Sequence, residues 1–129
     1  MGVGFLLDTN AIIDYLDNKL TESASILIAE SKTNISVINR MELLSWPGAG
    51  KQQTTILLKF IKLSNEYSLT EPIINRAIEL RKSYKTKLPD AIIAATALVN
   101  DFTLVTRNVK DFDKIKGLAV INPHNVKNT

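Results

Sequence analysis

Short runs of hydrophobic residues alternate along the chain with longer segments in which hydrophobic positions recur at helical spacing. The short runs have the length and apolar character of buried strands. These predicted strands are Gly4–Leu7, Asn34–Ser36, Tyr67–Leu69, Thr103–Thr106 and Leu118–Ile121. The predicted helices are Ala11–Leu16, Ser23–Ser31, Ser36 or Val37 to about Trp46, Lys51–Leu63, Glu71–Tyr84 and Pro89–Asn100. Strands that alternate with helices predict an α/β sandwich with a mainly parallel sheet.

The composition supports one folded domain over residues 1–129, since 45% of the residues are hydrophobic and can fill a core. The chain has no cysteine, which excludes disulfides, thiolate metal sites and cysteine nucleophiles and fits a reducing compartment. Its single histidine, His124, lies five residues before the last position. A His-rich zinc site is therefore excluded, and we interpret His124 as an ordinary surface residue.

The N-terminal run GVGFLL is short, lacks a basic lead and ends at Asp8, so it does not have the pattern of a signal peptide. No stretch of the sequence is long enough to span a bilayer. We therefore expect a cytoplasmic protein with no membrane partner. The net charge of +3 permits a polyanionic partner but does not require one.

Acidic residues follow predicted strands or begin predicted helices at several points. In parallel sheets, sites form beyond the carboxyl ends of the strands, and Asp8 directly follows the first predicted strand. Asp90 comes just after Pro89, in the first turn of the last predicted helix, where the helix dipole favours an anion. Glu42 lies among hydrophobic residues of its helix. Each has a purely structural explanation: Asp8 as an N-cap, Asp90 in favourable dipole contact and Glu42 at a solvated helix edge.

Carboxylates that converge repel one another and need a cation or shared protons. With no cysteine and one histidine, the suitable ions are Mg²⁺ and Mn²⁺, which accept oxygen ligands. Such an ion can lower the pKa of a bound water and stabilise charge on a phosphate under attack. Basic residues close to these acids are either ordinary solvated charge or contacts for a phosphate backbone. They are Lys85, Lys87, Arg107 and Lys110.

Four motifs, LLDTN, R-x-E-L, LPDAIIAATAL and LVTRNVKDF, together resemble the PIN domain, and within it the VapC toxins of toxin–antitoxin pairs. The resemblance covers nearly the whole chain and includes the final GLAVINP. It implies a three-layer α/β/α sandwich and a metal-dependent endoribonuclease. It also implies a homodimer that a small antitoxin holds inactive.

By this resemblance, Asp8, Glu42 and Asp90 match the three most regular acids of the family and are the expected ligands of Mg²⁺ or Mn²⁺. The family's fourth acidic position is Asn108 here, which puts a second metal ion in doubt. Asp111, three residues further on, is the alternative source of that charge.

Three further polar residues match the family pattern. Thr106 matches a hydroxyl position that could bind a metal-bound water. Thr9 and Asn10 complete the D-T-N signature. Asn10 is expected to orient a metal ligand by hydrogen bonding, without touching the metal itself. Trp46 and Tyr84 could stack on bases, but we interpret both as packing residues at helix ends.

Other functions compete with this one. A receiver domain needs paired acids after the first strand and an Asp after a middle strand, where this chain has one acid and Ser36. A haloacid-dehalogenase-like phosphatase needs D-x-D after the first strand, where Asn10 replaces the second acid. A non-catalytic binding module, with the acids as caps and solvated charge, also stays open. Metal titration separates such a module from a nuclease.

The resemblance further implies where an antitoxin would bind. Its arginine could insert beside Asp8 and Asp90, because guanidinium pairs with carboxylates in a bidentate way. Its apolar residues would fill a groove between the early helices. The residues expected to line that groove are Ile12, Ile13, Leu16, Leu27 and Leu57.

Overall fold

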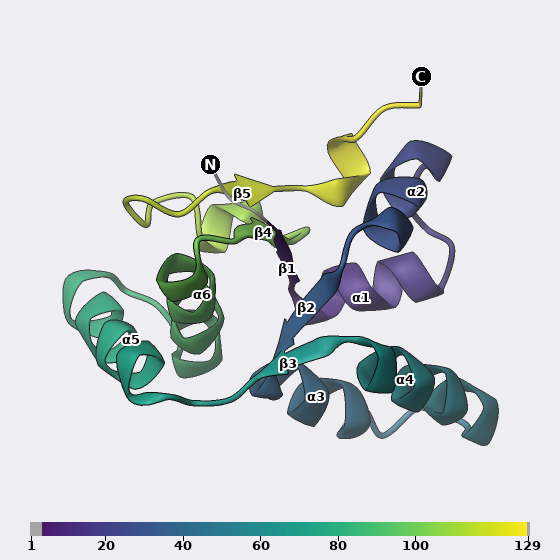
Figure 1. Cartoon of the computed structure of the whole chain (residues 1–129), viewed down its shortest axis with the longest axis horizontal. Helices are drawn as coiled ribbons and strands as arrows, with labels where there is room; N and C mark the ends of the chain where they lie inside the picture. Colours follow the sequence, from purple (N-terminus) through teal and green to yellow (C-terminus); the bar gives the residue numbers. More distant parts are fainter. Residues whose placement is uncertain (1–3, 129) are drawn as a thin grey trace.

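The computed structural model describes residues 4–128 and contains a five-stranded, wholly parallel sheet in the order β3-β2-β1-β4-β5 (Figure 1). The strands are β1 (Phe5–Leu7), β2 (Thr33–Ser36), β3 (Asn65–Tyr67), β4 (Thr103–Val105) and β5 (Val120–Ile121). The helices are α1 (Thr9–Leu16), α2 (Glu22–Glu30), α3 (Val37–Leu44), α4 (Lys51–Leu63), α5 (Glu71–Ser83) and α6 (Leu88–Asn100), with 3₁₀ turns η1 (Val109–Asp111) and η2 (Pro123–Asn125). Gly2 and Val3 of the N-terminal run lie outside the described residues.

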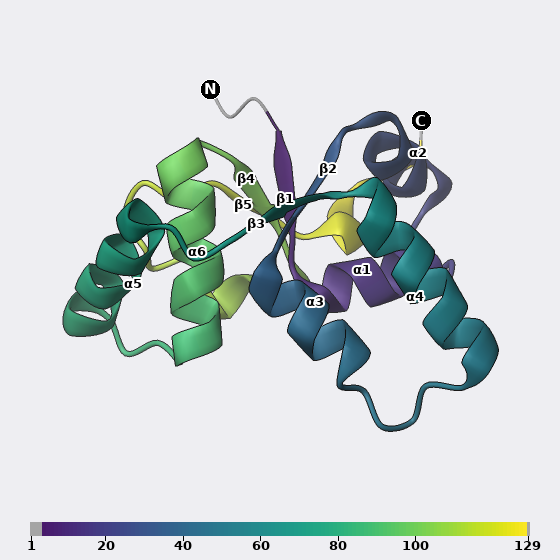
Figure 2. The same cartoon turned by 60° about the horizontal axis from the view of Figure 1, so that its bottom comes forward.

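Neighbouring residues of the central strands face opposite sides of the sheet, as the two-residue period of a strand requires. Leu6 and Leu104 pack with α5 and α6, whereas Leu7 and Val105 pack with α1 to α4. Figure 2 shows the sheet between these two groups of helices. Two hydrophobic cores on one parallel sheet confirm the expected three-layer α/β/α sandwich.

Helix α6 lies close to the sheet because small residues cover its inner face. Ala91, Ala94, Ala95 and Ala97 are fully buried. Thr96 is buried as well, and its hydroxyl is satisfied within the helix by donating to the carbonyl of Ile92 at 2.7 Å. This packing fixes the start of α6, and therefore Asp90, relative to the strand ends.

Several predicted boundaries need correction. The third strand is Asn65–Tyr67, not Tyr67–Leu69: it begins directly after the Ser64 cap of α4, and Asn65 pairs with Asn34 of β2. Leu69 is exposed instead. Helix α3 ends at Leu44, short of Trp46, and β5 begins at Val120. Propensity alone does not reveal where a cap or a pairing partner stops an element.

Within residues 4–128, no helix combines the length and the hydropathy needed to cross a membrane.

Candidate active site

The sheet order reverses at β1, where β2 and β3 follow on one side and β4 and β5 on the other. In open parallel sheets, ligands bind beyond the carboxyl ends of the strands at such a reversal. Asp8 follows β1 there and Thr106 follows β4. The backbone N–H of Asp8 donates to the carbonyl of Val105 at 2.9 Å, so the two strand ends are joined.

The Asp8 side chain is buried and held by three donors. Its Oδ1 accepts from the backbone N–H of Thr9 at 2.9 Å, so Asp8 does cap α1. Its Oδ2 accepts from the Thr106 hydroxyl at 2.8 Å and from the Asn10 amide at 3.2 Å. Burial raises the pKa of Asp8, and the charge of Glu42 adds to this, while the hydrogen bonds from Thr106, Thr9 and Asn10 oppose it. The carboxyl group is therefore fixed in orientation but costly to ionise.

Glu42 approaches the same point from α3. Its Oε1 accepts from the Thr9 hydroxyl at 2.7 Å, and that hydroxyl accepts from the buried Asn39 amide at 3.1 Å. Asn39 is fixed in turn by a capping box, in which it accepts from the Ser36 N–H at 2.7 Å. Glu42 is exposed, but it is also tied to the start of α1.

Asp90 completes the cluster from the first turn of α6. Its pKa is raised to about 6 by burial and then by the negative charges of Asp8, Asp111 and Glu42, with Lys87 acting in the opposite direction. These four acids come from four separate elements. Their charges interact, which is the behaviour expected of a cluster that awaits a cation or shares protons.

The donor set fits a hard divalent cation in its chemistry. Within residues 4–128, no Lys or Arg side chain forms an ion pair with any of the four acids. The side chains are nevertheless spread, and across the same range no three acidic or histidine side chains surround a single point closely enough to hold a metal ion. Binding of such a cation would therefore require these side chains to turn toward a common centre.

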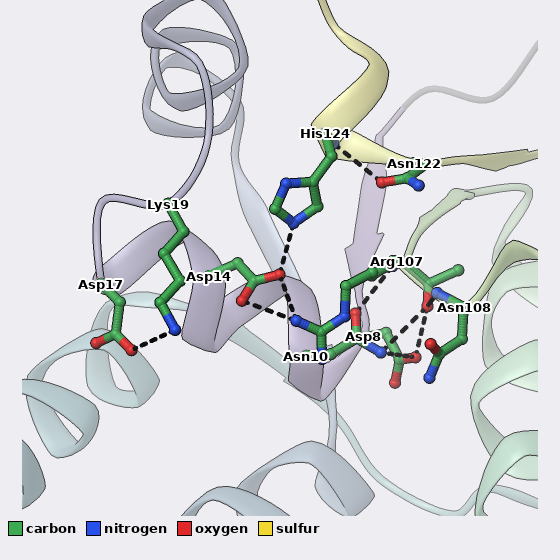
Figure 3. A network of polar contacts seen from close by, with 10 residues as sticks. Asp8, Asn10, Asp14, Asp17, Lys19, Arg107, Asn108, Asn122 and His124 are labelled. Carbon is green, nitrogen blue, oxygen red and sulfur yellow. Dashed lines mark hydrogen bonds and ion pairs between the residues drawn. The ribbon is translucent and has the colours of Figure 1, made fainter.

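Thr106 and Asn108 border the Asp8 carboxylate. The Thr106 hydroxyl donates to Asp8 and accepts from the backbone N–H of Asn108 at 3.0 Å, so its proton is committed to Asp8. Figure 3 shows Asn108 beside Asp8. Asp111 is exposed on η1 and acts on Asp90 through its charge.

The four basic residues differ in their surroundings. The guanidinium of Arg107 pairs with Asp14 at 3.0 Å, and its side chain is half-exposed. Lys85, Lys87 and Lys110 are exposed, and Lys87 occupies the N-cap position of α6, three residues before Asp90. The three lysines therefore stay available for the predicted phosphate contacts, whereas Arg107 already has a carboxylate partner.

Sequence reasoning missed Asp14 and the contact that His124 makes with it. His124 is exposed, as expected of a surface residue, but its imidazole contacts a buried carboxylate. Asp14 is 2% exposed, and its carboxylate lies 2.7 Å from Nε2 of His124. The available signal was an acid on the apolar face of α1, four residues after Asn10. Such a position predicts a buried charge that must find a partner.

The predicted antitoxin groove needs a partial correction. Ile12 and Leu57 are buried and belong to the core beneath the helices. A small groove between α1 and α4 does include three of the predicted residues, Ile13, Leu16 and Leu57, whereas Ile12 and Leu27 do not line it. The rest of its lining is Asp17, Trp46, Gln53 and Ile56. Tyr84 packs against the α5–α6 core as expected, and its hydroxyl accepts from the N–H of Lys116.

Comparison with known proteins identifies relatives of this site and fold. The family model for the PIN domain matches residues 5–118. Ribonuclease VapC1 of Rickettsia felis is 29% identical over 133 residues, covering 92% of this chain and 96% of that protein. A toxin–antitoxin complex from Klebsiella pneumoniae contains a chain 32% identical to this one, with a TM-score of 0.75 and coverage of 95% of this chain and 100% of that chain. DNA-bound VapBC from Salmonella typhimurium gives 25% identity and a TM-score of 0.78, covering 94% of this chain and 98% of that chain.

Proposed function

The chain belongs to the PIN-domain family, and from this premise we propose that it is the ribonuclease toxin of a VapBC-type toxin–antitoxin pair. The receiver-domain and phosphatase alternatives fall away with this membership. The observation that carries the proposal is the gathering of four acids at the reversal point of the sheet, where burial and then the charges of Asp8, Asp111 and Glu42 raise the pKa of Asp90.

Asp8, Glu42 and Asp90 would hold the metal ion, Mg²⁺ or Mn²⁺, which prefers carboxylate oxygens. When bound, the ion supplies a water of lowered pKa and stabilises negative charge on the phosphate. The contribution of the chain is orientation. Oδ2 of Asp8 already accepts two hydrogen bonds, whereas Oδ1 accepts one and keeps acceptor capacity for a cation.

Glu42 and Asp90 would turn toward Asp8 as the ion neutralises their repulsion. Thr9 joins Glu42 to the start of α1, and the buried alanines of α6 hold the backbone of Asp90 against the sheet. Thr106 and Asn10 keep Asp8 fixed meanwhile. Rigid elements thus hold the backbones of all three acids, and only the side chains of Glu42 and Asp90 have to move when the ion binds.

RNA reaches this edge of the sheet as a polyanion. In this proposal the exposed lysines near the acids supply phosphate contacts; they are Lys85, Lys87 and Lys110. Arg107 is mainly paired with Asp14. We also propose that residues 1–129 form one domain, that two copies associate, and that the protein acts in the cytoplasm on cellular RNA. A small antitoxin restrains it in this proposal, which the similar chain in a toxin–antitoxin complex from Klebsiella pneumoniae supports.

The decisive experiment is RNA cleavage with Mg²⁺, with Mn²⁺ and with EDTA. Asp90→Asn should reduce cleavage by more than the roughly 10–100-fold typical of residues that only support a ligand. Asp113→Asn is the matched control, because Asp113 is an exposed acid of the neighbouring loop that does not act on Asp90. Full activity of Asp90→Asn, or cleavage that EDTA leaves unchanged, would contradict the proposed metal site, whereas no cleavage by the wild type with either ion would favour a non-catalytic binding module.

A further inference from the structure

Asp14 is a charged side chain buried on α1, away from the four acids of the site. An isolated buried carboxylate is costly, so its partners are informative. Nη1 of Arg107 lies 3.2 Å from Oδ1 and 3.0 Å from Oδ2, and Nε2 of His124 lies 2.7 Å from Oδ2 (Figure 3). These partners come from the segment after β4 and from η2, which are distant in sequence from α1.

The same arginine is also bound through its backbone. The N–H of Arg107 donates to Oδ1 of Asn10 at 2.9 Å, and the amide of Asn10 donates to Oδ2 of Asp8 at 3.2 Å. Helix α1 therefore holds Arg107 twice, by its guanidinium at Asp14 and by its backbone at Asn10. Both contacts fix the segment after β4 against the helix that carries Asp8.

That segment also supplies the other donor to Asp8. Thr106 directly precedes Arg107, and its hydroxyl donates to Asp8 at 2.8 Å. Asn108 directly follows, and its N–H donates to the Thr106 hydroxyl. Any shift of Arg107 away from α1 would move both side-chain donors that orient Asp8. Apolar residues of similar volume often stabilise a fold as well as a buried ion pair does. Stability alone is therefore a weak reason for the Asp14–Arg107 pair.

We propose that Asp14, Arg107 and His124 form a positioning cluster for the active site. Asp14 holds Arg107 so that Asn10 and Thr106 keep the Asp8 carboxylate oriented, and His124 makes the C-terminal turn η2 part of this support. The inference rests on the proposed ribonuclease function, because Asp8 matters most if it binds the metal ion. None of the three residues is required to touch RNA in this role.

The test compares Asp14→Asn with the wild type in cleavage and in metal binding. The substitution should lower kcat by roughly 10–100-fold and raise the Mn²⁺ concentration for half-maximal activity, with KM for RNA changed little. Ile73→Val, in the core on the α5 side of the sheet, serves as the control for general loss of stability. It should leave kcat and the Mn²⁺ requirement unchanged at temperatures below its melting transition.

A second arm uses Asn10→Ala, which breaks the connection between Arg107 and Asp8. The cost of Asp14→Asn in this background should be much smaller than in the wild type, because coupled residues are not additive. If Asp14→Asn does not fold, Arg107→Lys replaces it, since lysine keeps the charge but loses the planar guanidinium. Wild-type kcat and Mn²⁺ requirement in a folded variant would overturn the proposal.

An NMR readout separates this inference from the proposed function. His124 is the single histidine, so its imidazole nitrogen resonances are assigned without ambiguity. Asp14→Asn should shift them and should also shift the side-chain amide of Asn10. If the wild type cleaves no RNA, the proposed function fails, and the chemical shift of the Asn10 side-chain amide becomes the test of the positioning cluster. An Asn10 amide resonance that Asp14→Asn leaves unshifted would overturn the positioning cluster.

Discussion

The carboxyl group of Asp90 lies in the first turn of α6, where the helix dipole favours its charge. Burial and the charges of Asp8, Asp111 and Glu42 outweigh that effect and raise its pKa to about 6. The unfolded chain restores the ordinary value of 3.8. At pH values between these two, the folded protein binds this proton more tightly than the unfolded chain does, so the residue stabilises the fold as the pH falls.

In metal-free protein, the melting temperature should therefore gain a contribution from Asp90 as the pH is lowered from 7 to 5. Asp90→Asn should raise the melting temperature at pH 7 in EDTA, because it removes like-charge repulsion, and should weaken the pH dependence. Thermal unfolding of both proteins across this range measures the effect. Asp113→Asn should reproduce the wild-type profile, and parallel profiles for Asp90→Asn and wild type would show that the acids do not interact.

Asn108 sets the second residue-scale prediction. If it faces the metal ion, Asn108→Asp should lower the Mn²⁺ concentration for half-maximal cleavage, since it adds a negative ligand beside Asp8. If Asp111 already supplies that charge, Asp111→Asn should cost more activity than any change at Asn108. Mn²⁺ titrations of cleavage distinguish the two cases. The absence of a metal effect in both variants would place both residues outside the site.

Residues with a local signature could be predicted from the sequence, and residues defined by distant contacts could not. Asp8, Glu42 and Asp90 each lie in a motif of a few residues, and the structure brings their charges into interaction. The contacts of Asp14 with Arg107 and His124 join positions 93 and 110 residues apart. Nothing in the local pattern of α1 identifies those partners, although it indicates that some partner is needed.

At the scale of elements, helices were more predictable than weak strands, and several helix starts carry side-chain signals. Asp8 caps α1, Ser36 caps α3, and a proline lies in the first turn of both α5 and α6. These signals depend on side chains at fixed offsets. Strand β3 has few hydrophobic residues and is defined by its pairing with β2, which the sequence of Asn65–Tyr67 alone does not specify.

The end of α6 gives an element-scale prediction. Asp101 stops the helix in the left-handed region at φ 55°, and its negative charge lies at the negative end of the helix dipole. Asp101→Gly should raise the free energy of unfolding by about 0.5–1 kcal/mol, since glycine adopts this conformation without a Cβ clash. Urea unfolding measures the change.

Asp17 at the end of α1 is the matched control, because it is also an acidic C-cap but has a φ of −87°. Asp17→Gly removes the same charge without relieving any strain, so it should leave stability unchanged or lower it. Equal gains in the two variants would assign the effect to charge alone.

At the scale of the molecule, the alternation of strands and helices predicted the class of fold but not the strand order β3-β2-β1-β4-β5. That order depends on which edges of the sheet the crossovers reach. In the resulting fold, hydrophobic surface stays exposed on helices α2 and α4, at Ile26, Leu27 and Ile56. The predicted groove was therefore right in its general location and for Ile13, Leu16 and Leu57, but wrong for the fully buried Ile12 and for Leu27, which does not line it.

The last prediction concerns restraint of the proposed toxin in cells. Expression of the wild type alone should arrest growth, and co-expression with its cognate small antitoxin should restore growth. Asp90→Asn should be harmless without any partner, because it lacks nuclease activity.

Ile56→Asp, in the α1–α4 groove, should stay toxic but resist neutralisation, because burying the new charge against an apolar antitoxin segment is costly. Leu63→Asp, on the same helix but more exposed and outside that groove, should be neutralised like the wild type. Growth curves and co-purification of the pair measure these effects. Equal tolerance of wild type and Asp90→Asn in cells without the antitoxin would contradict the toxin assignment, whereas normal neutralisation of Ile56→Asp would contradict only the groove.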